Sequence, residues 1–210
     1  MLYDITQPLF TADIYPGDPK PEKRMLMRLS DGDVCNLTAL SLCAHNGTHV
    51  DAPLHFLADG KGIGDLALSK FIGPAYVGTI DGAVTAEHAR TLLNKAREAY
   101  PDAQRRILIR GDATVSLEAA AVFADAGVDL LGNESQTVGP FDAPAAVHLT
   151  LLKAEVVLLE GVRLSVVPDG AYLLNCAPIN LGDCDGAPCR ATLTTLSDLY
   201  FLFLNQEKNY

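Results

Sequence analysis

Short apolar segments alternate with helix-forming segments between residues 85 and 175, and this alternation most strongly limits the fold. A first helix is expected after Thr85, a suitable N-cap, because the apolar residues that follow recur at helical spacing. Ser116 can cap a second helix, which we expect to stop at Gly127. A third helix is expected near Pro144, with Asp142 as its cap.

Four apolar segments between and after these helices have the length of buried strands. They lie at residues 106–110, 128–131, 154–160 and 171–175. Strands that alternate with helices along the chain are typical of an α/β layer. We therefore expect an α/β fold.

The first 64 residues have a different character, because they are rich in Pro, Gly and Asp and contain only short apolar runs. The segment YPGD at residues 15–18 predicts a turn. Residues 24–29 and 35–42 predict paired strands, the second alternating apolar with polar side chains. With no linker or internal repeat in view, we expect this β-rich section and the α/β layer to form one domain over residues 1–210.

Charge and composition argue against several classes of partner. The formal net charge is −10 with no run of Lys or Arg, so nucleic acid and anionic membranes are not expected partners. No segment approaches the roughly 18 apolar residues of a membrane-spanning helix, and the first residues lack the features of a secretion signal. The five cysteines form no CxxC pair. We expect reduced, mostly structural thiols and a cytoplasmic protein.

Three of the five histidines lie in one short segment, at positions 45, 49 and 55, and Asp51 lies among them. Imidazole and carboxylate together are the ligand set that Zn, Mn and Fe prefer. Gly47 allows backbone angles that other residues avoid, and Pro53 stiffens the chain after the carboxylate. The segment therefore predicts a rigid loop that holds a catalytic metal ion.

Two further residues are candidate ligands, because one carboxylate can bridge two ions if the chain supplies a second ligand set. His148 lies on the third predicted helix, and Glu160 ends a buried strand. A charged residue at such a position is costly unless it is paired or bound to metal. Taken alone, a helical histidine is usually a hydrogen-bonded core or rim residue, and a glutamate after a strand usually faces solvent. His88 is expected to be solvated on the exposed face of the first helix.

The segment HNGTHVDAPLHF at residues 45–56 resembles the signature of the cyclase family of metal-dependent hydrolases, which includes the bacterial kynurenine formamidases and the isatin hydrolases. The resemblance extends to YPGD at residues 15–18 and to the twelve-residue spacing between His148 and Glu160. It also covers API at residues 177–179 and GAPCRA at residues 186–191.

This resemblance implies the family's swivelling β/β/α fold and a role for each candidate. Metal ligands would be His45, His49 and Asp51 for one ion, with Asp51 bridging to a second ion held by His148 and Glu160. His55 would be the uncoordinated general acid/base. The cofactor would be Zn²⁺, two ions per chain, with Mn²⁺ possible. The family forms dimers or larger homo-oligomers, to which the apolar residues 200–204 could contribute unless they form a buried strand.

The implied reaction is hydrolysis of a small-molecule amide, with N-formyl-L-kynurenine, an intermediate of tryptophan catabolism, as the first expected substrate. Two positions depart from the formamidases. Tyr15 stands where they have Trp and would contact the substrate ring, and Asn133 stands where they have an Asp. Three alternatives remain: hydrolysis of another amide or an isatin-like cyclic amide, a non-haem iron oxygenase, and a metal-binding protein without catalysis.

Overall fold

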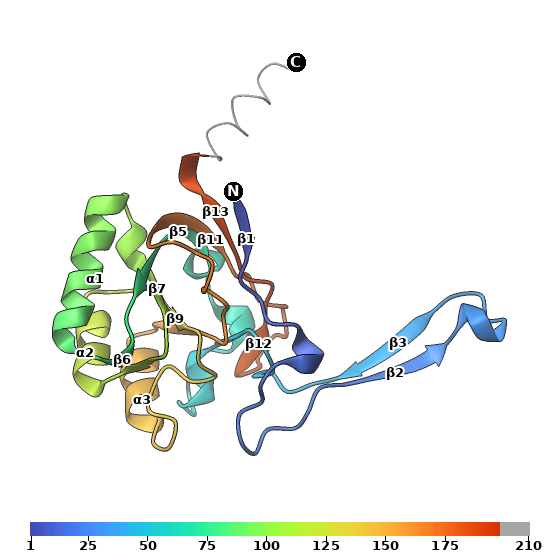
Figure 1. Cartoon of the computed structure of the whole chain (residues 1–210). Helices are drawn as coiled ribbons and strands as arrows, with labels where there is room; N and C mark the ends of the chain where they lie inside the picture. Colours follow the sequence, from blue (N-terminus) through green and yellow to red (C-terminus); the bar gives the residue numbers. More distant parts are fainter. Residues whose placement is uncertain (198–210) are drawn as a thin grey trace.

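A nine-stranded mixed sheet forms the centre of the computed structural model, which describes residues 1–197 (Figure 1). In spatial order its strands are β1 (Leu2–Asp4), β13 (Thr192–Thr195), β11 (Gly170–Asn175), β5 (Ile72–Thr79), β7 (Arg106–Arg110), β9 (Leu130–Asn133), β10 (Val157–Glu160), β4 (His49–Asp51) and β12 (Gly186–Pro188). The four central strands β5, β7, β9 and β10 are parallel. The strands on either side of them pair antiparallel.

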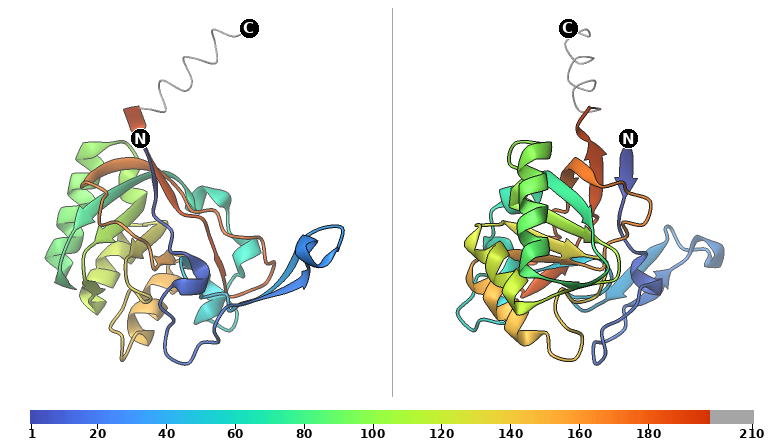
Figure 2. Two further views of the ribbon diagram at one scale, coloured as in Figure 1. Left: turned by 45° about the vertical axis from the view of Figure 1, so that its right-hand side comes forward. Right: turned by 60° about the vertical axis from the view of Figure 1, so that its left-hand side comes forward.

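Three helices cover one face of this sheet: α1 (Ala86–Ala99), α2 (Leu117–Asp125) and α3 (Ala145–Lys153) (Figures 1 and 2). Successive residues of a strand point to opposite faces, so Ile107 packs toward the helices and Leu108 packs away from them. On β10, Leu158 joins the helix-side core while Leu159 joins the core on the other face. Burial on both faces explains why these strands read as continuous apolar runs.

Two of the three N-caps predicted from the sequence are present in the structure. The Thr85 side chain accepts a hydrogen bond from His88 N, and the Ser116 side chain accepts one from Ala119 N. Asp142 was expected to cap α3, and this is wrong. Residues 140–143 form a turn of their own, leaving Asp142 exposed, and the N-cap is Pro144 without a side-chain hydrogen bond.

Strand boundaries differ from expectation where helix and strand meet. The strand expected from residue 154 begins at Val157, because α3 runs to Lys153 and Glu155 has a left-handed φ of 56° in the connecting turn. The strand expected at 128–131 is shifted to Leu130–Asn133. Residues 200–204, considered as an interface or a buried strand, lie outside the described residues.

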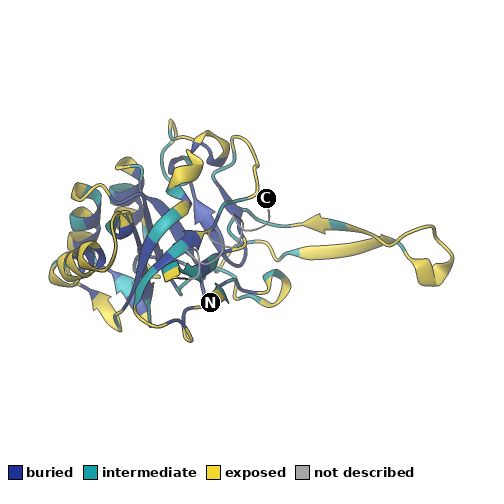
Figure 3. Ribbon diagram, turned by 90° about the horizontal axis from the view of Figure 1, so that it is seen from above, coloured by how far each residue is buried: buried dark blue, intermediate teal, exposed yellow. Residues whose placement is uncertain are grey.

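Two small sheets accompany the large one. The predicted strand pair is present as β2 (Glu22–Met27) and β3 (Leu37–Ser41), an antiparallel hairpin that projects from the body and is largely exposed (Figure 3). Strands β6 (Gly82–Val84) and β8 (Ala113–Val115) pair in parallel. Single 3₁₀ turns lie at Leu9–Thr11, Leu29–Asp31, Pro53–His55, Ile63–Asp65, Leu68–Lys70 and Ala103–Arg105. Among residues 1–197, no helix has the length and apolar character needed to span a bilayer.

Candidate functional site

Strand β4 carries two of the candidate ligands on one side. His49 and Asp51 are two positions apart, so both side chains point to the same face, while Val50 between them packs in the apolar core. All three residues are buried. Because β4 lies between β10 and β12, its backbone is hydrogen-bonded along both edges. The two ligands are therefore held by the sheet itself.

The pairing of β4 with β10 brings in Glu160, which stands opposite His49. Glu160 Oε2 lies 3.5 Å from His49 Nε2, and Asp51 Oδ1 lies 3.4 Å from the same nitrogen. The other nitrogen of His49, Nδ1, lies 3.0 Å from the carbonyl oxygen of Gly47, to which it can donate. That hydrogen bond leaves Nε2 free to face the carboxylates.

His148 reaches the same carboxylates from α3. Its Nε2 lies 3.3 Å from Glu160 Oε1 and 3.8 Å from Asp51 Oδ2. Its Nδ1 lies 3.0 Å from the carbonyl oxygen of Pro144, one helical turn earlier. The carbonyl at the start of the helix therefore orients this imidazole in the same way that Gly47 orients His49.

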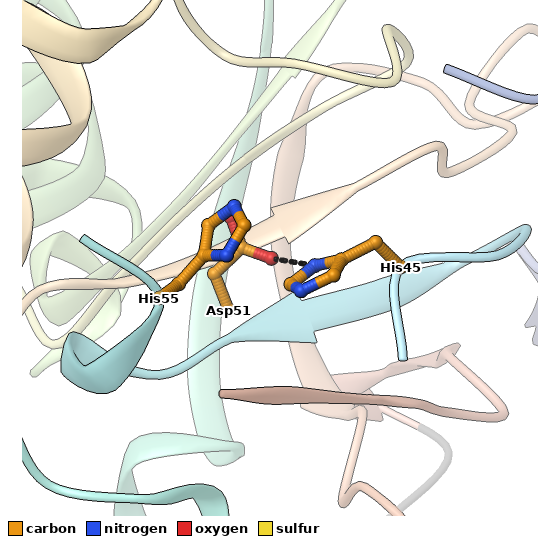
Figure 4. Close-up of side chains that lie close together, drawn as sticks. All are labelled: His45, Asp51 and His55. Atoms are coloured by element: carbon orange, nitrogen blue, oxygen red, sulfur yellow. Dashed lines mark hydrogen bonds and ion pairs between the residues drawn. The ribbon is translucent and has the colours of Figure 1, made fainter. Parts of the chain in front are cut away.

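His45 and His55 approach Asp51 from the loops on either side of β4, and the three side chains point toward one another (Figure 4). His45 Nδ1 lies 2.9 Å from Asp51 Oδ1. His55 comes from the 3₁₀ turn Pro53–His55, and its ring centroid lies 4.0 Å from that of His45.

The donor atoms fall into two groups that share one residue. His45, Asp51 and His55 form one group, and His49, Asp51 and Glu160 form the other, with donor atoms within 4.8 Å of one another in each. Asp51 is the residue common to both groups. The grouping differs in detail, because His49 lies with Glu160 rather than with His45, and His55 lies close enough to be a donor.

The protonation of these groups reflects their mutual contacts. Burial alone would lower the pKa of His45, but the hydrogen bond and charge of Asp51 raise it to about 9. Burial would also lower the pKa of His49, yet Asp51 and Glu160 raise it well above its usual value. For Asp51, burial acts to raise the pKa, and the hydrogen bonds from His45 and His49 hold it well below its usual range. The site thus strongly favours positive charge beside its carboxylates.

This donor set fits divalent metal ions. Asp51 and Glu160 are 1% and 3% exposed, and two buried carboxylates need compensating positive charge. His49 and His148 each direct one ring nitrogen at them while the other nitrogen is satisfied by a backbone carbonyl. That outer hydrogen bond is the usual companion of a metal-bound imidazole.

A cavity of about 290 Å³ opens over these residues. Its wall includes Tyr15 and Phe56, together with Asp18, His45, His49, His55, Gln136, Thr137, Pro144, His148 and Glu160. The Tyr15 hydroxyl donates to the carbonyl oxygen of Phe141 at 3.0 Å, and the two rings lie 5.1 Å apart. The predicted turn is present, since Asp18 N donates to Tyr15 O and Gly17 has a φ of 101°. Tyr15 therefore lies on the wall of the cavity, held by its own turn and by Phe141.

A family model described as Cyclase matches residues 3–140. The chain belongs to the Cyclase family. Two relatives called kynurenine formamidase cover nearly its whole length. The one from Salinibacter ruber is 35% identical over 94% of this chain and 99% of its own, and the one from Paracidovorax citrulli is 33% identical over 93% and 97%.

Solved structures agree with the fold of this Cyclase-family chain. A protein described as a potential metal-dependent hydrolase with cyclase activity superposes with a TM-score of 0.77 at 24% identity, covering 92% of this chain and 96% of that one. Isatin hydrolase A from Labrenzia aggregata gives 0.78 at 17% identity, covering 93% of each chain. The α/β fold of the cyclase type expected from the sequence is confirmed.

Asn133 lies apart from the cavity of this Cyclase-family chain. It is fully buried at the end of β9, and its amide donates to the carbonyl oxygens of Ala113 at 3.2 Å and Thr137 at 3.3 Å. Two carbonyl acceptors require a donor, which an Asp carboxylate cannot supply. The amide at this position therefore serves the backbone around β9.

Sequence reasoning missed Asp185, whose carboxylate contacts both His45 and His55. It directly precedes the GAPCRA segment, but a lone Asp after an exposed loop gives no signal by itself. Only the pairing of β12 with β4 brings it to the site.

Proposed function

We propose that this chain is a metal-dependent amide hydrolase and that its substrate is N-formyl-L-kynurenine, which it cleaves to L-kynurenine and formate. The observation that carries the proposal is the pair of donor groups sharing Asp51 beneath a cavity with an aromatic wall. The reaction class expected from the sequence is supported by full-length relatives named kynurenine formamidase. Tryptophan catabolism is the setting that follows.

The metal we propose is Zn²⁺, two ions per chain, with Mn²⁺ as an alternative. His45 and Asp51 would hold one ion, and His49, Asp51, His148 and Glu160 would hold the other. The nitrogen and oxygen donors suit both metals. When bound, such ions supply a water acidic enough to attack near neutral pH and polarise the scissile carbonyl group.

His55 is the residue we assign to proton transfer. Its ring lines the cavity beside His45 and is only part-buried, so it can reach both the substrate and solvent. Its Nδ1 lies 3.3 Å from Asp185 Oδ2, which leaves Nε2 for the substrate. Cleavage of the amide requires a proton for the departing nitrogen, and imidazole is the side chain best suited to deliver one near neutral pH.

The aromatic residues on the cavity wall support an aryl amide as the substrate. Tyr15 and Phe56 line the cavity, and the first is backed by Phe141. Aromatic side chains prefer offset or edge contacts with another ring. A volume of about 290 Å³ is at the small end for ligand sites and suits a single-ring substrate.

The deciding experiment is turnover of N-formyl-L-kynurenine by protein loaded with Zn²⁺, beside protein stripped by chelator and then reloaded. We expect release of kynurenine only in the loaded and reloaded samples. Absence of turnover with metal still bound would reject this substrate, and isatin-like cyclic amides would be assayed next. One bound Fe with consumption of O₂ would identify an oxygenase, and tight metal binding without any turnover would reject catalysis.

We also propose that the chain forms a homodimer or larger homo-oligomer through the β2–β3 hairpin. Six large apolar side chains of this hairpin are exposed: Met25, Leu26, Leu29, Val34, Leu37 and Leu40. An isolated two-stranded hairpin is marginally stable in water, so a covering surface is needed. The basic residues Lys23, Arg24 and Arg28 are balanced by Glu22, Asp31 and Asp33, so the hairpin is neutral on a chain that carries −10, and two copies would repel each other least along it.

Sedimentation velocity tests this assembly. We expect the wild-type protein to sediment as a dimer or larger species and the Leu26→Ser/Leu37→Ser variant to shift toward the monomer. A Leu68→Ser/Val166→Ser variant, which changes exposed apolar residues outside the hairpin, is the control. A monomeric wild type would reject the proposal.

Because all five cysteines are free thiols, we propose a reducing, cytoplasmic setting for the protein.

A further inference from the structure

One carboxylate oxygen lies between two imidazoles of the site. Asp185 Oδ2 is 2.9 Å from His45 Nε2 and 3.3 Å from His55 Nδ1. One of these rings belongs to the proposed metal ligands, and the other is the proposed proton donor. Asp185 itself belongs to neither group of donor atoms. It therefore contacts both a proposed metal ligand and the proposed proton donor without having either role.

The sheet holds Asp185 in this place. Its carbonyl oxygen accepts a hydrogen bond from Ala52 N at 2.9 Å, and the next residue, Gly186, pairs with Asp51. A Cβ atom on Gly186 would lie 2.8 Å from Val50 O and 2.9 Å from His45 Cε1. The His45 ring thus packs directly on the backbone that follows Asp185, which only glycine permits. The position of the carboxylate relative to both rings is set by backbone pairing.

The contact has a chemical consequence for His45. An ionised carboxylate only accepts hydrogen bonds, so the nitrogen that faces it must carry hydrogen. For His45 both nitrogens face a carboxylate, since Nε2 contacts Asp185 and Nδ1 lies 2.9 Å from Asp51 Oδ1, so each carries hydrogen while no cation is bound. A cation held by Asp51 would take the place of the hydrogen on Nδ1, while Nε2–H stays bound to Asp185 and keeps the ring in position.

The same oxygen also contacts His55, but through the other ring nitrogen, Nδ1. It accepts from Nδ1, which leaves Nε2 as the nitrogen that exchanges a proton with substrate. His49 and His148 obtain the equivalent support from the backbone carbonyls of Gly47 and Pro144. For His45 and His55 the support comes from one side chain, that of Asp185, so a single substitution can remove it.

We propose that Asp185 is a positioning residue that fixes the orientation and tautomer of both His45 and His55. It couples metal binding to proton transfer through a single oxygen atom. The role in proton transfer rests on the function proposed above, whereas the role in holding His45 for metal does not depend on the substrate.

The test compares Asp185→Ala and Asp185→Asn with the matched control Asp183→Asn, an exposed carboxylate two residues earlier. We expect Asp185→Ala to lower kcat by about 10- to 100-fold with KM changed less than about twofold, and to weaken metal binding by about tenfold. The amide oxygen of Asn can still accept one hydrogen bond, so Asp185→Asn should be intermediate. The Asp183 variant should match the wild type in all three quantities.

Two readouts do not need the substrate. Competition with a chelator measures Zn²⁺ affinity, and ¹⁵N spectra of histidine-labelled, Zn²⁺-loaded protein report which ring nitrogen carries hydrogen. We expect Nε2–H on His45 and Nδ1–H on His55 in the wild type, with both assignments lost in Asp185→Ala. Assigning each signal requires the His45→Gln and His55→Gln variants.

Unchanged tautomers and unchanged Zn²⁺ affinity in Asp185→Ala would overturn the proposal. A variant that fails to fold by circular dichroism is replaced by Asp185→Asn, read by the same spectra. If the wild type does not hydrolyse N-formyl-L-kynurenine, the proposed function fails. Altered tautomers and Zn²⁺ affinity in the Asp185 variants would in that case still support the positioning role.

Discussion

Glu160 stands directly opposite His49 in the antiparallel pairing of β10 with β4, and its Oε2 lies 3.5 Å from the imidazole Nε2. The two residues come from distant parts of the chain and meet only through this register. A shift of one residue would turn one of the two side chains to the apolar face. The site is therefore specified by strand pairing as much as by the ligands themselves.

Removal of the shared carboxylate should abolish metal binding. Asp51 lies in both groups of donor atoms, so Asp51→Ala is expected to lose bound metal and all measurable activity. Metal analysis after dialysis checks this, with Asp59→Ala, an exposed carboxylate on the following loop, as the control. Full metal content in the Asp51 variant would contradict the assignment of this residue as a bridge.

His55→Ala separates proton transfer from metal binding. We expect the variant to retain its metal and to lose about 10²- to 10⁴-fold in kcat, the usual contribution of a positioned acid or base. The control is His88→Ala, which changes an exposed histidine on α1. Because the His55 ring lies within one donor group, a loss of metal in this variant would show instead that it is a ligand.

Tyr15 should affect substrate binding more than turnover. Its ring lines the cavity, so Tyr15→Ala is expected to raise KM for N-formyl-L-kynurenine by about 2- to 10-fold, the range of one aromatic contact. Tyr15→Phe keeps the ring and loses only the hydrogen bond to Phe141 O, so it should have the smaller effect. Steady-state kinetics distinguish the two. An unchanged KM in Tyr15→Ala would place the substrate elsewhere in the cavity.

The N-cap of α1 should matter for stability and not for catalysis. Thr85 accepts from His88 N, and His88 accepts in return from Thr85 N, forming a capping box. Thr85→Ala is expected to cost about 1 kcal/mol of unfolding free energy. Urea unfolding measures this loss. Thr91→Ala, on the exposed face of the same helix, should cause none, and an equal loss in both variants would argue against a specific cap.

The cysteines should divide by burial in their reaction with a thiol reagent. Burial raises the pKa of Cys189 to about 12 and that of Cys176 well above its usual value, so neither thiol should react in the native protein at pH 8. Cys35 is exposed and should react first. Five thiols should appear after unfolding in guanidinium. Rapid reaction of all five in the native state would show that these thiols are accessible.

Much of the secondary structure could be predicted from local signals. Thr85 and Ser116 cap their helices because a side-chain oxygen meets a free backbone N–H, which depends on neighbouring residues only. The β2–β3 pair follows from two short segments, the second of which alternates apolar with polar side chains. The cap at Asp142 failed because residues 140–143 close their own turn, an arrangement that the preference of Asp for N-caps does not contain.

The candidate metal ligands on β4 were also within reach of the sequence, because three histidines and Asp51 gather in one short segment. That segment was expected to be a loop, whereas His49–Asp51 form a strand paired on both edges. His148 and Glu160 could be proposed as ligands only from the family resemblance, since neither position by itself indicates a metal ligand. Asp185 was out of reach, because its role arises from the pairing of β12 with β4. The orientation of Asn133 away from the cavity likewise depends on carbonyl groups contributed by other segments.

Strand β4 has only three residues, yet both of its edges are paired and all three side chains are buried. Opening it requires breaking two ladders of the central sheet at once, which is close to unfolding the domain around it. Its amide hydrogens should thus exchange with deuterium as slowly as those of the parallel core, with or without metal. When a metal ion dissociates, the candidate ligands on β4 would then keep their positions. Another ion could therefore bind without refolding of the strand.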